Sequence, residues 1–307
     1  MSEHDTTSLQ LDPKTLSAMH AADIADVFEH TTPAEHALIM SILDADKRAE
    51  LLVYLDAHER RDLLDVRSPA QIAELVGELE SDDAADVLGE LEEQTQIRVL
   101  EAIESEDPNE AKEVRALLDY PADSAGGLMQ AEIASITYSA TAAEALEALR
   151  ASQDDADSMH FIFVTDQQGK FIGVVRMARL ALANPNSPIA EIFEPKFVDV
   201  QAHVDQEEVA QLFAKYDIIT LAVVDKNEQL LGRIMVDDVL EVWAQEADED
   251  AFRMVGSDAD ELQYQRNPFR LAFIRLPWLL INLVGSAATG WMLYLFQGTL
   301  IDHIVLI

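Results

Sequence analysis

The sequence predicts a multidomain chain with an all-α superhelical hairpin-repeat domain, an α/β pair of duplicated modules, a connecting helix and one transmembrane helix. Three observations lead to this prediction. Short amphipathic helical segments fill the first third, alternating strand and helix patterns occur twice in the middle, and a long uncharged apolar stretch lies near the end. A length of 307 residues also exceeds that of one ordinary domain.

The charge balance restricts the possible partners. Asp and Glu number 58 against 21 Lys and Arg, which gives a formal net charge of −37. No nucleic-acid partner is expected, because nucleic acids are bound by basic surfaces. Such a chain attracts cations, although solubility or adaptation to high salt explains the acidity equally well. The absence of cysteine excludes disulfides and thiolate metal sites.

The N-terminal third is predicted to contain stacked helical hairpins. Three prolines suited to a first helical turn each follow a residue suited to the N-cap. These pairs are Thr32-Pro33, Ser68-Pro69 and Asp107-Pro108. The segment Asp23–Phe28 is similar to Asp83–Leu88, and a repeat of this kind indicates hairpins that share one core. Chance similarity within an ordinary helical domain remains an alternative.

The middle of the chain changes to strand-like patterns after Pro121 and the pair Gly126-Gly127. The strand-like runs are Phe161–Val164, Phe171–Val175, Leu221–Val224, Leu230–Leu231 and Ile234–Val236. Helical stretches are expected over Ala142–Ala151 and Gln206–Tyr216. Strands that alternate with helices predict α/β units.

These α/β units form two copies. Val164-Thr-Asp166 followed by Gly173 corresponds to Val223-Val-Asp225 followed by Gly232. Each copy has an acidic helix opening, and the turn that contains Asp precedes a glycine and hydrophobic residues. In these features the pair resembles tandem CBS modules.

The stretch 276–301 carries no charged residue and exceeds the roughly 20 residues that cross a bilayer. A transmembrane helix in contact with lipid is therefore expected, with a buried core helix as the alternative. Arg266, Arg270 and Arg275 precede the stretch. The positive-inside rule then places residues 1–270 in the cytosol, at the inner (cell) membrane.

Four further stretches resemble the MgtE family of magnesium transporters. They are Glu80–Asp86, Tyr120–Met129, Val236–Val242 with the acidic run after it, and Arg275–Leu280. The expected boundaries are a disordered tail over 1–12, an acidic helical-repeat N domain over 13–129, CBS modules over 130–196 and 197–245, a plug-like connecting helix over 246–270 and the transmembrane helix over 271–301.

The resemblance implies a homodimer, formed through the CBS modules, that closes its pore when cytosolic Mg²⁺ bridges acidic domains. Five membrane helices are typical of the family, so one predicted span implies a truncated product, a split gene or a fragment. No P-loop, GxSxG or HExxH motif is present, and no enzyme is predicted. The alternative is a membrane-tethered CBS regulator that binds a nucleotide or partner and conducts nothing.

Mg²⁺ prefers oxygen ligands and keeps several waters, so carboxylates on facing surfaces can bridge through it. Asp82 and Asp86 are four residues apart and are expected to share a helix face. The resemblance assigns metal roles to eleven carboxylates in three regions. They are Glu50, Asp82 and Asp86 in the helical domain, Asp205, Glu207, Asp217, Asp238 and Glu241 in the second module, and Glu246, Glu249 and Asp250 on the connecting helix.

The nucleotide signature of CBS modules is incomplete here. That signature pairs a hydroxyl with an Asp after Gly and two hydrophobic residues. Gly173-Val-Val-Arg176-Met-Ala-Arg179 lacks both groups, and Gly232-Arg-Ile-Met235-Val-Asp-Asp238 keeps only the Asp. ATP binding is therefore doubtful. Arg176 and Arg179 are expected to pair with nearby acids, with contact to phosphates as the alternative.

Overall fold

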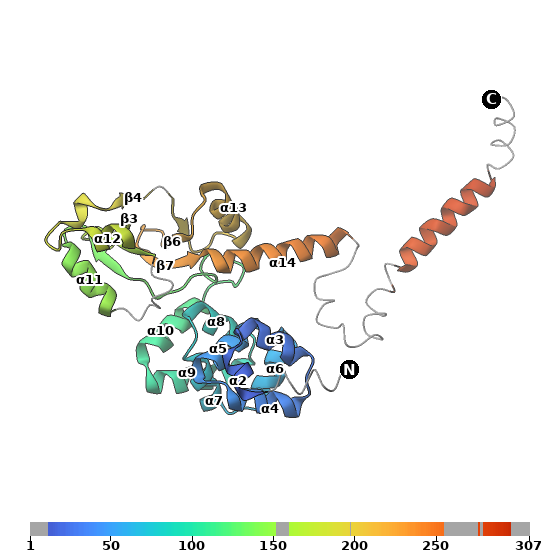
Figure 1. Ribbon diagram of the computed structural model, residues 1–307. Coiled ribbons are helices and arrows are strands. Elements are labelled where there is room, and N and C mark those ends of the chain that lie inside the picture. The colour runs from blue at the N-terminus through green and yellow to red at the C-terminus, as the bar shows by residue number, and fades with distance from the viewer. Residues whose placement is uncertain (1–11, 152–159, 197, 255–275, 277–278, 296–307) are drawn as a thin grey trace, which may run out of the picture. The chain divides into compact units, whose positions relative to one another are not determined.

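The computed structural model describes residues 12–151, 160–196, 198–254, 276 and 279–295 (Figure 1). The chain divides into two compact units, Met1–Trp243 and Ala244–Ile307. The first unit contains an all-helical domain and two α/β modules. The predicted order of helical domain and α/β pair is confirmed.

The helical domain consists of short helices joined by tight turns. They are α2 (Pro13–Ala18), α3 (Ala21–Glu29), α4 (Pro33–Ile42), α5 (Ala45–Tyr54), α6 (Ala57–Asp65), α7 (Pro69–Val76), α8 (Ser81–Gly89), α9 (Glu93–Glu106) and α10 (Pro108–Leu117). The two similar segments found in the sequence occupy α3 and α8, and both helices bury an apolar face. Phe28 is fully buried and stacks on His36 with ring centroids 3.7 Å apart.

The three expected N-caps are confirmed. Thr32 and Ser68 form capping boxes with Glu35 and Gln71, and the Asp107 carboxylate accepts hydrogen bonds from backbone N–H groups at the start of α10. These contacts satisfy amide donors that a helix start leaves without intrahelical partners. Each proline sits where its missing N–H costs nothing.

The first α/β module pairs a four-stranded sheet with two helices and one short 3-10 helix. Its elements are β1 (Ser135–Thr137), α11 (Ala142–Ala151), β2 (Phe161–Thr165), β3 (Phe171–Arg176), α12 (Met177–Leu182), η1 (Ile189–Glu191) and β4 (Glu194–Pro195). The strand order is β1-β2-β3-β4, with β1 and β2 parallel and the later pairs antiparallel.

The second module repeats this plan with a three-stranded sheet. Its elements are β5 (Val200–Gln201), α13 (Gln206–Tyr216), β6 (Thr220–Val224), β7 (Leu230–Met235) and α14 (Val236–Met254). Val164 pairs with Gly173 in the first module, and Val223 pairs with Gly232 in the second. The register shift follows immediately in both, so the predicted duplication holds at the level of single residue pairs. The two runs expected around Arg233 are one strand, β7.

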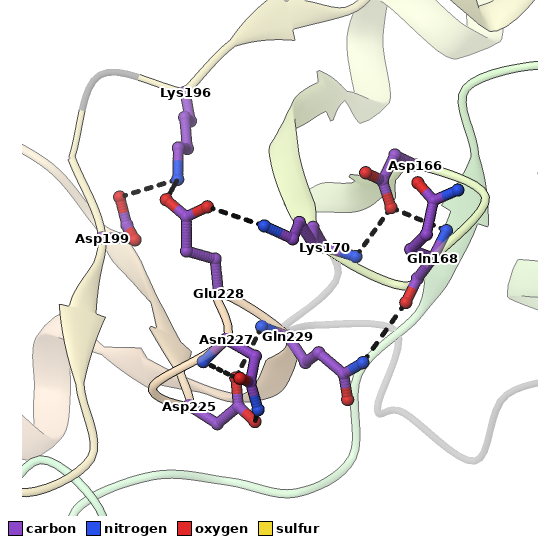
Figure 2. A network of polar contacts seen from close by, with 9 residues as sticks. All are labelled: Asp166, Gln168, Lys170, Lys196, Asp199, Asp225, Asn227, Glu228 and Gln229. Atoms are coloured by element: carbon purple, nitrogen blue, oxygen red, sulfur yellow. Dashed lines mark hydrogen bonds and ion pairs between the residues drawn. The ribbon is translucent and has the colours of Figure 1, made fainter.

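The hairpin turns of the two modules join side by side (Figure 2). In each turn an aspartate, Asp166 or Asp225, accepts backbone hydrogen bonds from residues two and four positions later. The Glu228 carboxylate accepts a hydrogen bond from Lys170 Nζ and another from Lys196 Nζ, each at 3.3 Å. A small apolar cluster around Phe163 and Phe171 packs between the modules.

The two turns differ at one equivalent position. Gly169 has φ 83° in the first module, and Glu228 has φ 64° in the second. Glycine adopts this left-handed region readily, whereas a long side chain rarely does. Because its carboxylate contacts two lysines of the first module, Glu228 gains interactions that a glycine could not make.

The helical domain contacts the second module through the segment that enters the first. Gln130 and Arg233 exchange backbone hydrogen bonds of 2.8 and 3.0 Å. The Gln130 amide also donates to Glu80 at 2.6 Å, and Ser81 Oγ lies 2.7 Å from Glu132 Oε2. One apolar core accordingly runs from the helical domain into the second module.

The second unit begins within α14, which continues to Met254. A further helical stretch covers 279–295, and large apolar side chains on it are exposed. Within the part of the chain that the structure describes, no helix combines the length and apolar character needed to cross a bilayer. The predicted transmembrane helix over 271–301 lies partly outside that part and stays a prediction.

Candidate functional site: an acidic cluster between α8 and α14

The first turn of α8 holds a buried carboxylate that faces the start of α14. Asp82 is only 7% exposed, and its Oδ1 atom has no hydrogen-bond partner. Burial raises the pKa of Asp82 well above its ordinary value, and the nearby carboxylates of Asp238, Asp83 and Glu80 raise it further. An anion in this place costs free energy unless a proton or a cation neutralises it.

Asp238 is positioned by the strand-to-helix junction of the second module. Its Oδ2 atom accepts the backbone N–H of Met235 at 3.0 Å, which fixes the carboxyl group at the start of α14. Burial raises the pKa of Asp238 to about 8 despite this hydrogen bond, and Asp237 and Asp83 add repulsion. The helical domain and the second module thus place their acids against one another.

A second part of the cluster surrounds Arg60 of α6. Burial raises the pKa of Asp83 to about 7, with Glu80 and Glu241 contributing repulsion. Asp86 keeps more surface in solvent, and loss of water contacts raises its pKa less, to about 6. The positive charge of Arg60 lowers the pKa of Asp83 and of Asp86, and so counteracts part of the effect of burial. It has the same effect on Glu241, whose pKa is also raised by burial.

Tyr54, at the end of α5, lies close enough to the acidic cluster for its pKa to be affected by the same carboxylates. Burial raises the pKa of its phenol, and the carboxylates of Glu241, Glu50, Asp83 and Asp237 raise it further, in that order. The field therefore combines residues of α5, α8 and α14. A hard divalent cation is the species that such a set of oxygens would hold.

Five of the eleven predicted metal residues contribute to this cluster. They are Glu50, Asp82, Asp86, Asp238 and Glu241. Asp82 and Asp86 do not act as one pair, because Asp82 interacts with Asp238 whereas Asp86 interacts with Arg60, Glu90 and Glu241. Both lie in α8 four residues apart, the spacing of one helix face, and they have different electrostatic partners. Within the described residues, no group of three His, Asp or Glu has metal-binding geometry.

The other predicted residues lie elsewhere. Asp205 is the N-cap of α13, where its carboxylate accepts the N–H of Glu207 at 2.9 Å. Asp217 ends α13 in a left-handed conformation with φ 51°. Glu246 lies in α14 within the second unit, and the side chains of Glu249 and Asp250 are outside the described residues.

Sequence reasoning missed Asp83, Glu80, Arg60, Tyr54 and Asp237. Asp83 is three residues before Asp86 in the same acidic motif, and this spacing could have identified it. Arg60 could not have been found this way, because its role depends on the packing of α6 near α8. Its guanidinium lies 3.0 Å from Glu90 Oε1 and also donates to the Leu52 carbonyl.

A cavity of about 280 Å³ lies between the two modules, lined by β2, β3 and β4 and by the segment from Tyr216 to Ala222. Both lining cations are paired. Arg176 Nε lies 3.1 Å from Glu194 Oε1, and Lys196 Nζ lies 3.3 Å from a Glu228 oxygen.

The polar groups of this cavity fit a nucleotide poorly. Arg179 also pairs with Glu194, at 3.6 Å, so the expected pairing of Arg176 and Arg179 with nearby acids is confirmed. Asp217 adds a carboxylate to the lining, and Thr220 Oγ1 is buried without a partner. A phosphate chain could contact these lysine and arginine side chains only after their pairs with Glu194 and Glu228 open.

Comparison with known proteins identifies the family. The family model described as the MgtE intracellular N domain matches residues 19–123, and the CBS domain model matches 125–186 and 189–245. A solved structure, the cytosolic domain of the Mg²⁺ channel MgtE in complex with ATP, is 35% identical with a TM-score of 0.69, over 78% of this chain and 96% of that one. The chain belongs to the MgtE family.

Other relatives agree with this assignment. The soluble part of a magnesium transporter is 26% identical with a TM-score of 0.68, over 80% of this chain and 96% of that one. The magnesium transporter MgtE of Thermus thermophilus is 39% identical over 63% of this chain and 43% of its own length. That of Bacillus subtilis is 31% identical over 64% and 44%. This MgtE-family chain thus spans less than half of these curated relatives.

The positively charged side chain of Arg60 within the acidic cluster leads to a first prediction. Replacing Arg60 by Gln removes its ion pair with Glu90 and leaves the acids of α8 and α14 less compensated. Without divalent cations, the free energy of unfolding should fall by about 2 kcal/mol. The stabilisation gained from added MgCl₂ should increase, because carboxylates that have lost the positive charge of Arg60 attract Mg²⁺ more strongly. Urea unfolding with chelator and with MgCl₂ measures both changes, and an unchanged Mg²⁺ response would contradict the role assigned to Arg60.

Proposed function

We propose that this chain is the Mg²⁺-sensing gating region of a magnesium transporter, with the acidic cluster between α8 and α14 as part of the sensor. The supporting observation is Asp82, a buried carboxylate with an unpartnered oxygen that faces Asp238 across two domains. Neither residue has a basic partner among the described residues. The relatives named above are magnesium transporters, which supports the identity of the ion.

The physical basis is a difference in cation affinity between two arrangements. Mg²⁺ bridges surfaces through one or two carboxylates and retained waters. With Mg²⁺ bound, α8 and the start of α14 attract a common ion and stay together. Without it, the carboxylates repel one another and favour separation. A ligand that binds one arrangement more tightly shifts the population toward that arrangement.

The rest of the proposal extends to the whole transporter. The α/β modules form a homodimer, residues 1–270 lie in the cytosol, and 271–301 is the first membrane helix. Asp205, Glu207, Asp217, Glu246, Glu249 and Asp250 serve as further ligands on facing surfaces. The chain has a regulatory role and catalyses no reaction.

The test follows protease resistance and thermal unfolding of the full chain as MgCl₂ increases, with KCl matched in ionic strength. Mg²⁺ should protect and stabilise where KCl does not, because screening alone does not bridge two carboxylates. The Asp82→Asn and Asp238→Asn double variant should lose most of this protection. Glu93→Gln, an exposed acid at the start of α9, is the matched control and should behave as the parent chain.

A contrary result supports the second candidate, a membrane-tethered regulator that conducts nothing. Equal protection by KCl and MgCl₂ would show that acidity acts through general screening. Loss of the Mg²⁺ response in Glu93→Gln would show that the response depends on total charge and not on this cluster.

A further inference from the structure

A pair of arginines shares a small cavity on the helical domain, in a chain that is otherwise strongly acidic. The cavity has a volume of about 250 Å³ and is formed by α4, α5, the α6–α7 connection and α7. Arg48 comes from α5, and Arg67 lies just after α6. The buried side chains of Met40 and Leu75 form its apolar part.

Each of the two arginine side chains is held by a backbone carbonyl of its own chain segment. Arg48 Nε donates to the carbonyl of Asp44 at 3.1 Å, and Arg67 Nη1 donates to the carbonyl of Leu63. Within the described residues, neither arginine forms an ion pair. Burial lowers the pKa of Arg67, and the positive charge of Arg48 lowers it further. Two like charges in one partly enclosed space cost free energy, which an anion between them would recover.

Other donors line the same space. The side-chain oxygen of Gln71 is occupied by Ser68 in the capping box of α7, so its amide N–H groups remain available as donors. The Ser41 hydroxyl also lines the cavity, but it donates its hydrogen to the Leu38 carbonyl at 2.7 Å. One carboxylate, Glu74, also lines the cavity and would oppose an anion, which leaves one net positive charge.

We propose that this cavity binds a phosphate group between Arg48 and Arg67. Planar guanidinium forks bind tetrahedral oxyanions through paired, charge-assisted hydrogen bonds, and the Gln71 amide supplies further donors. The chain has 58 acidic residues, yet neither arginine pairs with a described carboxylate. The occupant is therefore an external anion, either free phosphate or a lipid headgroup phosphate. This site is separate from the acidic cluster and does not depend on the proposed function.

The test measures binding of sodium pyrophosphate to the full chain by titration calorimetry, with chelator present and NaCl as the ionic-strength control. Arg48→Gln and Arg67→Gln should each weaken binding about tenfold, the loss expected for a charge-assisted hydrogen bond. Arg98→Gln removes an exposed arginine of α9 and should leave binding unchanged. Glu74→Gln should tighten binding, because it removes the one opposing charge.

Each outcome is decisive. No pyrophosphate heat beyond the NaCl control, or equal weakening by Arg98→Gln, would overturn the proposal. A Glu74→Gln variant that loses stability and binds no tighter would show that Glu74 is the arginines' own counterion.

If Arg67→Gln fails to fold because α6 loses its contact at Leu63, Arg48→Gln and Glu74→Gln still test the site. Short-chain phosphatidic acid and short-chain phosphatidylcholine distinguish the two sources of phosphate. Tighter binding of phosphatidic acid than of pyrophosphate, with no binding of phosphatidylcholine, identifies a lipid headgroup. Tighter binding of pyrophosphate than of phosphatidic acid identifies free phosphate.

Discussion

Without divalent cations, the free energy of unfolding of this chain should fall by on the order of 3 kcal/mol as the pH rises from about 5 to about 8. The reason is the raised pKa values of buried carboxyls, about 7 for Asp83 and about 8 for Asp238. Their unfolded values lie near the ordinary 3.8, so the folded chain binds more protons throughout this range. Stability therefore decreases as the pH rises through the folded pKa values.

The surroundings of these carboxyls affect the size of this change. Glu80 and Asp237 raise the pKa values in the cluster, and Arg60 lowers that of Asp83. Glu110 contributes in the same direction from another site, because burial and its acidic neighbours raise its pKa to about 7. Added Mg²⁺ should flatten the profile, since a bound cation stabilises the ionised carboxylates.

Urea unfolding at several pH values, with chelator, measures this slope. The Asp83→Asn and Asp238→Asn double variant should lose less stability than the parent between about pH 5 and about pH 8, so that its advantage over the parent is larger at about pH 8 than at about pH 5. Glu93→Gln should leave the slope unchanged. A parent slope that persists in the double variant would place the responsible groups outside the cluster.

Gly232→Ala should destabilise the first unit by about 2–3 kcal/mol and weaken the response to Mg²⁺. A Cβ atom on Gly232 would lie 2.5 Å from the carbonyl oxygen of Gln130, which is backbone and cannot rotate away. The displaced segment carries the backbone hydrogen bonds to Arg233 and the Gln130 amide bond to Glu80. Glu80 immediately precedes α8, so the damage reaches the acidic cluster.

The matched control is Gly89→Ala at the end of α8, where a Cβ meets nothing within 4 Å. It should leave stability unchanged or raise it slightly, since alanine favours helices over glycine. Thermal and urea unfolding of both variants provide the comparison. If Gly232→Ala is as stable as Gly89→Ala, the close approach of β7 to Gln130 is not required.

Local signals in the sequence predicted most of the elements. Helix periodicity identified α11 and α13 with their observed ends, and cap residues located the starts of α4, α7 and α10. The short strands β1, β4 and β5 were missed, because two or three residues carry no recognisable alternation. Their conformation depends on pairing with β2, β3 and β6, which are distant in sequence.

The candidate site was predicted in part for a related reason. Acid spacing and family resemblance selected Asp82 and Asp238, but their mutual approach depends on how the helical domain packs on the second module. Spacing on one helix predicted a shared face for Asp82 and Asp86, but it could not show that Asp82 is buried whereas Asp86 is exposed. The arginine pair of the helical domain had no sequence signal, since Arg48 and Arg67 meet only through packing.

Glu228 bears on the order in which the two modules become ordered. Its left-handed backbone conformation is favourable only with partners, and both lysines that it contacts belong to the first module. The corresponding turn of the first module uses Gly169 and needs no such help. The first module should therefore be the more autonomous half, able to form its hairpin alone and then serve as a template for the second.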